Sequence, residues 1–587
     1  MNKAKISRAQ ILTFGLFVIL AIFAVRLFDI QVVQHDQYLA KANAMQTTKE
    51  TINPVRGQIY VRDADGTLAP LVLNQTVYTL FADPTQITDV TAVKNLVNQV
   101  AGGQVIDGSF ARLTDKSTEY VVLAKQISYD QAQEIQKANL AGLGLQAGTE
   151  RVYPEGALAS QVLGFVNADG QGQYGVEQDL NSELAGKPGL LQSVTDVRQI
   201  PLTIGAHDIS IPATNGTNIV LTLDRSVQSQ AEQTLASGLK AVGSSNGSMI
   251  VLDATNGHVL AMANYPSYDV SNYQNVTDAS VFQNAVVSYS FEPGSVFKTL
   301  TTAMSLDLGK ITPDTTYTNN YCVQIGDANI CNASGDQIYD GVKTMTQVLE
   351  DSLNTGVVWQ MQNLGGTVGT NTISQSAQQT MYDYFANHFR FGQLTGIQQA
   401  GEAAGTIFTP ASVYYDPVRF ANMSFGQGID VTMVQFASAF ASAVNGGVYY
   451  QPTLLDGTVN ADGTENVTKP TVLNPHTISQ TASYTLRDMI YTARQMSGKG
   501  AADGGYYVGS KTGTAQVYDP TTGTYSTTKT IGTMVGFLAD KDHNVKYVIM
   551  VRANDDDPNT GFAGTTAANP IFSSMALWLN QYEGVSK

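Results

Sequence analysis

Ser295 and Lys298 stand three positions apart and are the pair of side chains in this sequence best suited to covalent chemistry. The turn residues Pro293 and Gly294 precede them, and apolar residues recur every four positions from Val296 onward, so Ser295 should open a helix. Residues three apart on a helix are neighbours, which brings the Lys298 amine within reach of the Ser295 hydroxyl. A lysine whose pKa is lowered by burial or by a second cation can remove the proton of a serine. The pair therefore predicts a serine nucleophile activated by a lysine.

Two further clusters follow this SxxK pair along the chain: Ser352 with Asn354 (SxN), and residues 511–514 (KTGT). Taken alone, SxxK also fits an ordinary helix start, and SxN also fits a helix cap or a loop hydrogen bond. A nucleotide-binding loop is a rival interpretation of the third cluster, but Ser510 stands where that motif requires glycine. The three motifs in this order resemble the signature set of the penicillin-recognising serine enzymes.

The third motif offers groups for a peptide that ends in a carboxylate. Lys511 supplies a second cation that helps to keep Lys298 neutral and that attracts the carboxylate. Thr512 and Thr514 offer hydroxyls to the terminal carboxylate of a D-Ala-D-Ala-like peptide. Gly513 lets the substrate backbone lie against the edge of a strand. We expect all four residues to contact or orient substrate.

The second motif and two backbone groups complete the predicted site. Ser352 is placed to relay a proton to the leaving amine, and Asn354 to hold Lys298 and the substrate amide. The backbone N–H groups of Ser295 and Thr514 are the predicted oxyanion hole, and the helix N-terminus supplies backbone donors where the tetrahedral oxyanion would form. The predicted catalytic residues are therefore Ser295, Lys298, Ser352, Asn354 and Lys511.

Hydrophobic patterns around the motifs predict one antiparallel sheet covered by helices on both faces. Val227, Ala231, Leu235 and Leu239 recur every four positions and predict one buried helix face over residues 225–242. Asn256–Gly257 best fits the tight turn of a hairpin. Residues 295–450 are predicted to be mainly helical. The predicted strands are 218–224, 249–252, 259–263, 506–518, 531–538 and 545–551, and a last helix is predicted over 567–582, with Pro570 in its first turn.

The first residues predict a membrane anchor. Residues 9–25 are almost uninterrupted apolar residues, and three cations precede them: Lys3, Lys5 and Arg8. With residues up to 33 the run is long enough to span a bilayer once, and the positive flank places the N-terminus in the cytoplasm and the catalytic part outside. A cleavable signal peptide is the alternative, and both interpretations export the rest of the chain. We expect a cytoplasmic tail at 1–8 and a transmembrane anchor at 9–33 in the cell membrane.

Composition narrows the remaining possibilities. The formal net charge of -16 excludes nucleic acid as the expected partner, because phosphate binding requires a basic face. The six histidines are scattered singly, and the two cysteines lack the companions of a zinc site, so no metal and no cofactor are expected. Cys322 and Cys331 fit either one local disulfide or two unpaired thiols.

Residues 34–215 mix short strands such as 120–123 with helical stretches such as 129–138, without a catalytic cluster. The sequence therefore predicts an α+β protein with an extended α+β domain at 34–215 and a catalytic domain at 216–587.

Beyond the three motifs, the chain resembles the class B (monofunctional) penicillin-binding proteins over nearly its full length. The segment 56–60 with Asp65 and Gly66 is similar to the first motif of their pedestal, or dimerisation, domain, although Val61 stands where aspartate is usual. Residues 425–428 (FGQG) resemble the form found in septal, or division, members. Other pedestal elements resembled are Arg151 with Tyr153 and Pro154, 163–165, Gly175 with Glu177, and 184–189.

The resemblance implies a peptidoglycan D,D-transpeptidase that forms a Ser295 acyl-enzyme, releases D-Ala and is inhibited covalently by β-lactams. It implies stem peptides as substrates. No glycosyltransferase domain precedes the catalytic part, so a membrane glycosyltransferase of the shape, elongation, division and sporulation class is implied as a partner, together with division proteins. The alternatives are a D,D-carboxypeptidase or β-lactamase that uses water as acceptor, a non-catalytic β-lactam-binding scaffold, and a role in elongation instead of division.

Overall fold

The computed structural model describes residues 7–38, 41, 47–63, 65–194, 209–333, 341–410, 416–460, 462–519, 524–555 and 564–587. Most of the predicted cytoplasmic tail, residues 1–6, lies outside these ranges. The chain forms two compact units, the first made of Met1–Arg56 and Ala185–Gly216 and the second of Gly57–Leu184 and Thr217–Lys587.

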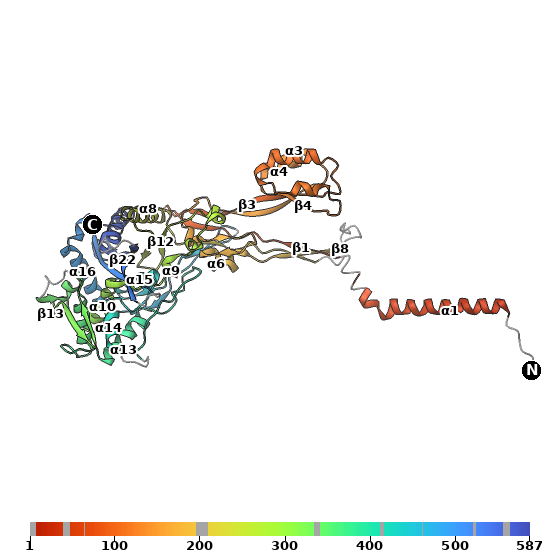
Figure 1. Cartoon of the computed structure of the whole chain (residues 1–587). Coiled ribbons are helices and arrows are strands. Elements are labelled where there is room, and N and C mark those ends of the chain that lie inside the picture. Colours follow the sequence, from red (N-terminus) through yellow and green to blue (C-terminus); the bar gives the residue numbers. More distant parts are fainter. Residues whose placement is uncertain are drawn as a thin grey trace, which may run out of the picture. The chain divides into compact units, whose positions relative to one another are not determined.

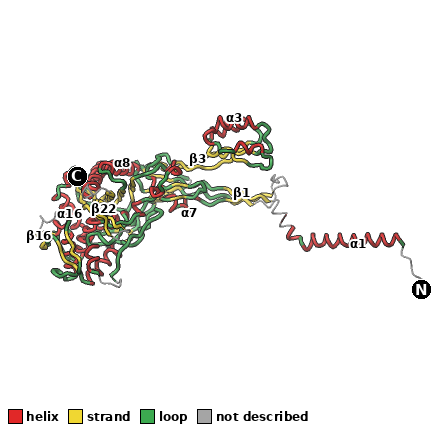
Figure 2. Tube along the Cα trace, viewed as in Figure 1, coloured by secondary structure: helices red, strands yellow, loops and turns green. Residues whose placement is uncertain are grey.

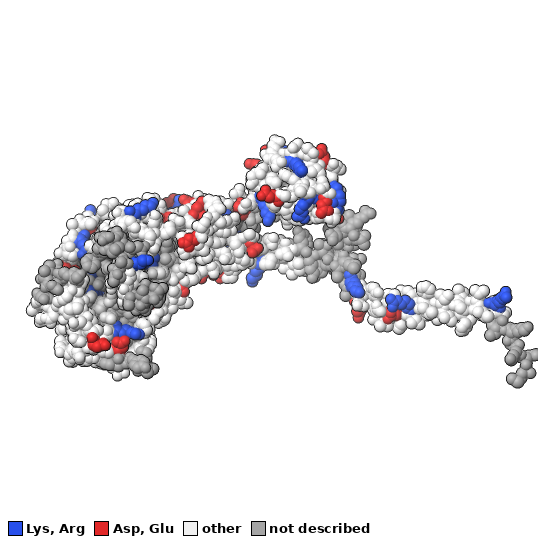
Figure 3. Space-filling view, in the orientation of Figure 1, with Lys and Arg blue, Asp and Glu red and all other residues white. Residues whose placement is uncertain are grey.

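The first unit begins with the predicted anchor helix (Figure 1). The helical run Arg8–Val33 is long and apolar enough to cross a membrane, and its most apolar stretch is not buried against the rest of the protein. Ser7 caps its start, with a reciprocal hydrogen bond to Gln10. Figure 3 shows an uncharged surface along most of this helix and charged side chains near its ends. The unit contains α1 (Arg8–Phe28), the π-turn η1 (Asp29–Val33) and an antiparallel sheet in the order β1 (Thr47–Ile52), β8 (Gly189–Val194), β9 (Ile209–Ile211).

The second unit contains a seven-stranded sheet that crosses the predicted domain boundary. Strand β10, from the predicted catalytic part, pairs in parallel with β2 from the predicted pedestal. The division at residue 215 therefore remains a prediction. The strands run in the order β19 (Glu465–Val467), β18 (Leu455–Val459), β10 (Asn218–Leu221), β2 (Ile59–Arg62), β3 (Leu68–Ala82) and β4 (Val121–Ile127), with β5 (Leu143–Val152) also on β3.

A buried ion pair joins three of the pedestal motifs. The Arg151 guanidinium lies 2.8 Å from the Glu177 carboxylate and donates to the Gly57 carbonyl (2.7 Å) and to Asn74 (2.9 Å). A Cβ at Gly57 would lie 1.9 Å from the Thr217 carbonyl oxygen, so only glycine fits there. The motifs that the sequence spreads over 120 positions thus meet at one point.

The far ends of β3, β4 and β5 form a lobe with its own small hydrophobic core. The predicted helix at 129–138 and the strand at 120–123 are confirmed there, as α4 and β4. The lobe's other elements are α3 (Val90–Ala101), η2 (Gly102–Gln104), η3 (Ser109–Thr114) and α4 (Tyr129–Ala138).

The predicted antiparallel sheet of the catalytic part has five strands, and the predicted strand at 218–224 is not one of them, because it forms β10 of the seven-stranded sheet. The hairpin at Asn256–Gly257 is confirmed, because β11 and β12 pair across it and Gly257 adopts a positive φ of 85°. Strand β21, which carries residues 511–514, lies at one edge. The order is β12 (Val259–Tyr265), β11 (Gly247–Asp253), β23 (Val545–Asp555), β22 (Thr524–Ala539), β21 (Tyr507–Asp519).

Helices cover both faces of this sheet, as predicted (Figure 2). On one face the four predicted apolar residues of α8 (Arg225–Ala241) are buried and pack with α17 (Asn569–Tyr582), preceded by η10 (Gly564–Ala568). The other face carries α10 (Lys298–Asp307), α15 (Met433–Val444) and α16 (Gln480–Met496). Alternate residues of the strands point to opposite faces of the sheet and contribute to the two hydrophobic cores, one on each face.

Shorter elements complete the second unit. The short helices are α5 (Ser160–Leu163), α6 (Gly175–Asp179), α7 (Asn181–Ala185), η4 (Val270–Asn275), η5 (Ala279–Phe282), α9 (Ala285–Ser288), η6 (Gly294–Phe297), α11 (Met345–Glu350), α12 (Asn354–Leu364), α13 (Gln375–Asp383), η8 (Tyr384–His388), α14 (Pro417–Met423) and η9 (Lys499–Asp503). The two-stranded pairs are β6 (Phe165–Val166) with β7 (Gly172–Gln173), β13 (Thr316–Asn319) with β16 (Gly341–Thr344), β14 (Cys322–Ile325) with β15 (Ala328–Cys331), and β17 (Tyr449–Tyr450) with β20 (Val472–Asn474).

Candidate active site

Ser295 lies at the start of a helix, but in a tighter turn than an α-helix. The 3₁₀ turn η6 carries Ser295 and runs directly into α10, which begins at Lys298. The Gly294 N–H donates to the Gly426 carbonyl (3.0 Å), and a Cβ at Gly294 would lie 2.8 Å from the Thr514 carbonyl oxygen. With a positive φ of 64° as well, this position requires glycine. The turn therefore brings Ser295 against both the FGQG segment and the KTGT strand.

The hydroxyl of Ser352 is the point where the two predicted lysines meet. It accepts hydrogen bonds from the amine of Lys511 (2.8 Å) and from the amine of Lys298 (3.2 Å), which also donates to the Ser352 backbone carbonyl. Ser352 holds a left-handed conformation with φ of 59°. The predicted contact of Lys298 with Ser295 stays a prediction, and the structure adds a contact of the Lys298 amine with Ser352. One serine hydroxyl thus links two amines in series.

Lys511 is buried and its amine is easily deprotonated. Burial, and next the nearby charge of Lys499, lower the pKa of Lys511 to about 7. A buried ion pair supports the strand of Lys511: the Arg494 guanidinium lies 2.6 Å from the Asp503 carboxylate and donates a hydrogen bond to the hydroxyl of Ser510 (2.7 Å). Sequence reasoning missed Lys499 and Arg494, since nothing in their spacing marks them as neighbours of the KTG motif.

Asn354 is anchored by a disulfide-bonded hairpin. Its side-chain amide donates to the Cys331 carbonyl (2.9 Å), and the structure joins Cys322 and Cys331 across β14 and β15, which decides between the two alternatives left open by the sequence. The next residue, Asn332, is buried and accepts from the N–H of Thr355 (3.0 Å). The hairpin therefore holds the SxN segment at the start of α12.

Close packing requires glycine at position 513, which the sequence did not reveal. A Cβ there would lie 2.3 Å from the Thr533 hydroxyl and 2.8 Å from the Pro293 carbonyl oxygen, so its strand can pack against the serine turn only with glycine. The Thr533 hydroxyl itself donates to Pro293 (2.9 Å). Thr512 and Thr514 alternate with the buried Gly513 and are partly exposed. The backbone of Thr514 thus lies next to the turn of Ser295, as an oxyanion hole shared by these two segments requires.

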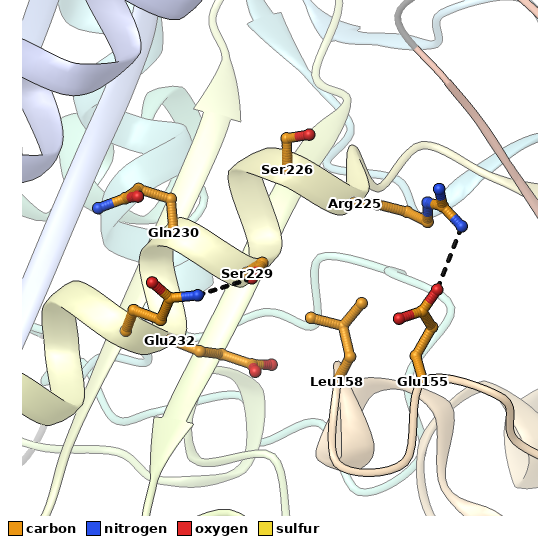
Figure 4. A pocket seen from close by; sticks show the side chains of 8 residues that line it. Glu155, Leu158, Arg225, Ser226, Ser229, Gln230 and Glu232 are labelled. Carbon is orange, nitrogen blue, oxygen red and sulfur yellow. Dashed lines mark hydrogen bonds and ion pairs between the residues drawn. The ribbon is translucent and has the colours of Figure 1, made fainter.

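One other feature of the second unit stands apart from these motifs. A shallow hollow of about 580 Å³ lies between α8 and the loop at Glu155–Leu158, and polar side chains such as Gln230 and Glu232 line it (Figure 4). None of the motif residues lines this hollow. Within the described ranges, no group of three His, Cys, Asp or Glu side chains is arranged to hold a metal ion.

Comparisons with known proteins match both parts of the chain. The family model of the penicillin binding protein transpeptidase domain matches residues 247–576, and that of the penicillin-binding protein dimerisation domain matches residues 51–221.

Several bacterial proteins are similar to this chain over most of its length. Penicillin-binding protein PbpB of Mycobacterium tuberculosis is 31% identical over 79% of this chain and 67% of its own length. Stage V sporulation protein D of Bacillus subtilis is 28% identical over 96% of this chain and 84% of its own. Peptidoglycan D,D-transpeptidase FtsI of Escherichia coli is 26% identical over 95% and 88%.

Solved structures share the fold. Penicillin binding protein 2X of Streptococcus thermophilus superposes with a TM-score of 0.73 at 24% identity, over 92% of this chain and 80% of that one. Penicillin binding protein 3 of Mycobacterium tuberculosis, complexed with aztreonam, gives 0.67 at 25% identity, over 92% and 98%.

Proposed function

The chain belongs to the class B penicillin-binding proteins, and from this premise we propose that Ser295 is the nucleophile with which it cross-links peptidoglycan stem peptides. The activity itself is that of a peptidoglycan D,D-transpeptidase in cell-wall synthesis. The single observation that supports the residue assignment is the series Lys298, Ser352 and Lys511, joined through one hydroxyl beside the serine turn. Such a series can move a proton between the attacking and the leaving group.

In the acylation step, the Ser295 oxygen attacks the carbonyl carbon of the penultimate D-Ala and gives its proton to the neutral amine of Lys298. The backbone N–H groups of Ser295 and Thr514 hold the oxyanion. When the tetrahedral intermediate collapses, the peptide bond breaks and the departing D-Ala nitrogen takes a proton from the Ser352 hydroxyl, which Lys511 or Lys298 replaces. With a pKa of about 7, Lys511 can both give and take that proton near neutral pH.

In the second step, an amine of a neighbouring stem peptide attacks the acyl-enzyme carbonyl, loses a proton to the same series, and releases Ser295. Asn354 and the hydroxyls of Thr512 and Thr514 orient the donor peptide, and Lys511 with these threonines faces its terminal carboxylate. A β-lactam acylates Ser295 in place of the donor peptide. Its leaving nitrogen stays tethered in the adduct, which blocks entry of the acceptor.

We also propose the cellular setting. Residues 9–33 anchor the chain in the cell membrane as a single span, with residues 1–8 in the cytoplasm and the pedestal (34–215) and transpeptidase domain (216–587) outside. A membrane glycosyltransferase of the shape, elongation, division and sporulation class supplies the glycan strands, and division proteins recruit the pair to the septum. The form of the FGQG segment, which resembles that of division members, supports the division role over elongation.

The deciding experiment is the intact mass of the detergent-solubilised full chain after incubation with benzylpenicillin, followed by peptide mapping. We expect one stable penicilloyl adduct on Ser295 and none on Ser295→Ala. Hydrolysed drug without an adduct would identify a β-lactamase-like hydrolase, and intact drug without an adduct would identify a non-catalytic scaffold.

A further inference from the structure

Two strand-like contacts fasten the serine turn to the segment that follows α14. Phe291 and Val431 exchange both backbone hydrogen bonds (3.0 Å each), and the N–H of Gly294 donates to the carbonyl of Gly426 (3.0 Å). Between these two contacts, on the serine side, stands Glu292. Its side chain is therefore held three residues from the nucleophile and opposite the FGQG segment.

One carboxylate oxygen of Glu292 joins three separate parts of the site. It accepts the N–H of Gly428 (2.7 Å) and the phenol O–H of Tyr525 (2.7 Å). Tyr525 belongs to β22, which pairs with the strand that carries residues 511–514, and Tyr525 itself pairs with Tyr518 beyond that motif. The serine turn, the FGQG segment and the β21–β22 hairpin therefore meet at a single atom.

The position of the Glu292 carboxylate is unfavourable for its charged form. Burial, and next the charge of Asp430, raise the pKa of Glu292, and in the described part of the chain no lysine or arginine pairs with it. Its second oxygen is buried without a hydrogen-bond partner among the described residues. A half-buried carboxyl group with one unpartnered oxygen destabilises a fold, so its presence beside the nucleophile points to a task for the other oxygen in the reaction.

We propose that Glu292 is a positioning residue for acylation, which holds the serine turn, the FGQG segment and the β21–β22 hairpin in the relative placement that the transition state requires. The inference rests on the proposed role of Ser295. Glu292 acts through hydrogen-bond acceptance by one oxygen, so an amide of the same shape should replace it. The hydrogen bond from Tyr525 to Glu292 fixes the β21–β22 hairpin relative to the serine turn.

The test compares Glu292→Ala, Glu292→Gln and Tyr525→Phe in the full chain in detergent micelles, with Glu134→Ala on the exposed face of α4 as the matched control. Stopped-flow acylation with a fluorescent penicillin gives the non-covalent dissociation constant and the acylation rate constant separately. Thermal unfolding of each variant shows how much of any change comes from lost stability.

We expect Glu292→Ala to lower the acylation rate constant about 10- to 100-fold while the dissociation constant changes less than about threefold, because the two hydrogen bonds that hold the three segments in place are lost. Glu292→Gln should stay within about threefold of the wild type, and Tyr525→Phe should fall between them. If Glu292→Ala does not fold, the other two variants still decide.

The proposal is overturned if Glu292→Ala acylates at the wild-type rate, if Glu292→Gln is as slow as Glu292→Ala, or if the dissociation constant alone changes. Failure of the proposed function is a different result, because then the wild-type chain itself would carry no adduct on Ser295.

Discussion

At the scale of single residues, Ser352 combines a strained backbone with a central chemical position. A non-glycine residue at φ of 59° costs about 1 kcal/mol or more, and its hydroxyl is the shared acceptor of two amines. Natural sequences keep such strain where function requires it. Substitution of Ser352 by glycine or by alanine therefore separates the energetic cost of the backbone conformation from the chemical role of the hydroxyl.

We predict that Ser352→Gly and Ser352→Ala slow acylation of Ser295 equally, by about 100- to 10,000-fold, because both lose the hydroxyl that relays the proton. Ser352→Gly should nevertheless be more stable than Ser352→Ala by about 1 kcal/mol, since glycine adopts φ of 59° freely. Fluorescent-penicillin kinetics and denaturant unfolding measure the two quantities. Wild-type acylation by either variant would remove Ser352 from the proton path.

Lys511 gives a prediction about pH and stability. The unfolded lysine keeps its proton up to its ordinary pKa of 10.5, whereas the folded one loses it near 7, so unfolding takes up a proton between these values. The contribution of Lys511 to the free energy of unfolding therefore rises as pH increases from about 7 towards 10. Below pH 7 the folded protein carries the full energetic penalty of the buried charge.

Lys511→Met lacks this dependence, so we predict that it is more stable than the wild type at pH 6.5 and that the gap narrows by pH 9.5. Denaturant midpoints followed by tryptophan fluorescence at four pH values measure it. A gap that stays constant over this range would mean that Lys511 does not titrate near neutrality.

At the scale of elements, Gly513 determines how closely β21 approaches the serine turn. Gly513→Ala places a methyl group 2.3 Å from the Thr533 hydroxyl, and β21 must move away. We predict a loss of about 1–3 kcal/mol of stability and roughly tenfold or greater slowing of acylation. Gly102→Ala, where a Cβ meets nothing within 4 Å, is the control and should change neither quantity. A fast Gly513→Ala enzyme would show that the close packing is dispensable.

Sequence patterns predicted the elements better than the contacts between them. The burial of Val227, Ala231, Leu235 and Leu239 follows from a spacing of four, because helix geometry is local. The bond from Lys298 to Ser352 could not be predicted, since it depends on where a loop far along the chain returns. Glu292 was visible only as a residue of the serine turn, because its partners Gly428 and Tyr525 carry no signal of contact. Spacing reveals which motifs exist, while tertiary packing decides which atoms meet.

At the scale of the whole molecule, the two ends of the anchor helix carry different charge. Lys3 and Lys5 precede the helix and Arg8 is its first residue, and no acidic residue stands among them in the sequence, whereas Arg26 at the other end is paired with Asp29 at 2.8 Å. Because clusters of lysine and arginine next to a membrane span stay on the cytoplasmic side, the N-terminus should remain inside and every catalytic residue should lie outside.

We therefore predict that protease added to intact spheroplasts removes the catalytic part and leaves a short fragment that still carries an N-terminal tag. Changing Lys3, Lys5 and Arg8 together to glutamine should lower the fraction digested from outside, because the charge difference that orients the helix is lost. Arg26→Gln is the matched control and should leave digestion unchanged, because removing a cation from the outer end does not reduce the excess of lysine and arginine on the cytoplasmic side. A tag that is digested while the catalytic part survives would reverse the orientation, and an untagged mature chain would mean that the segment is a cleaved signal peptide.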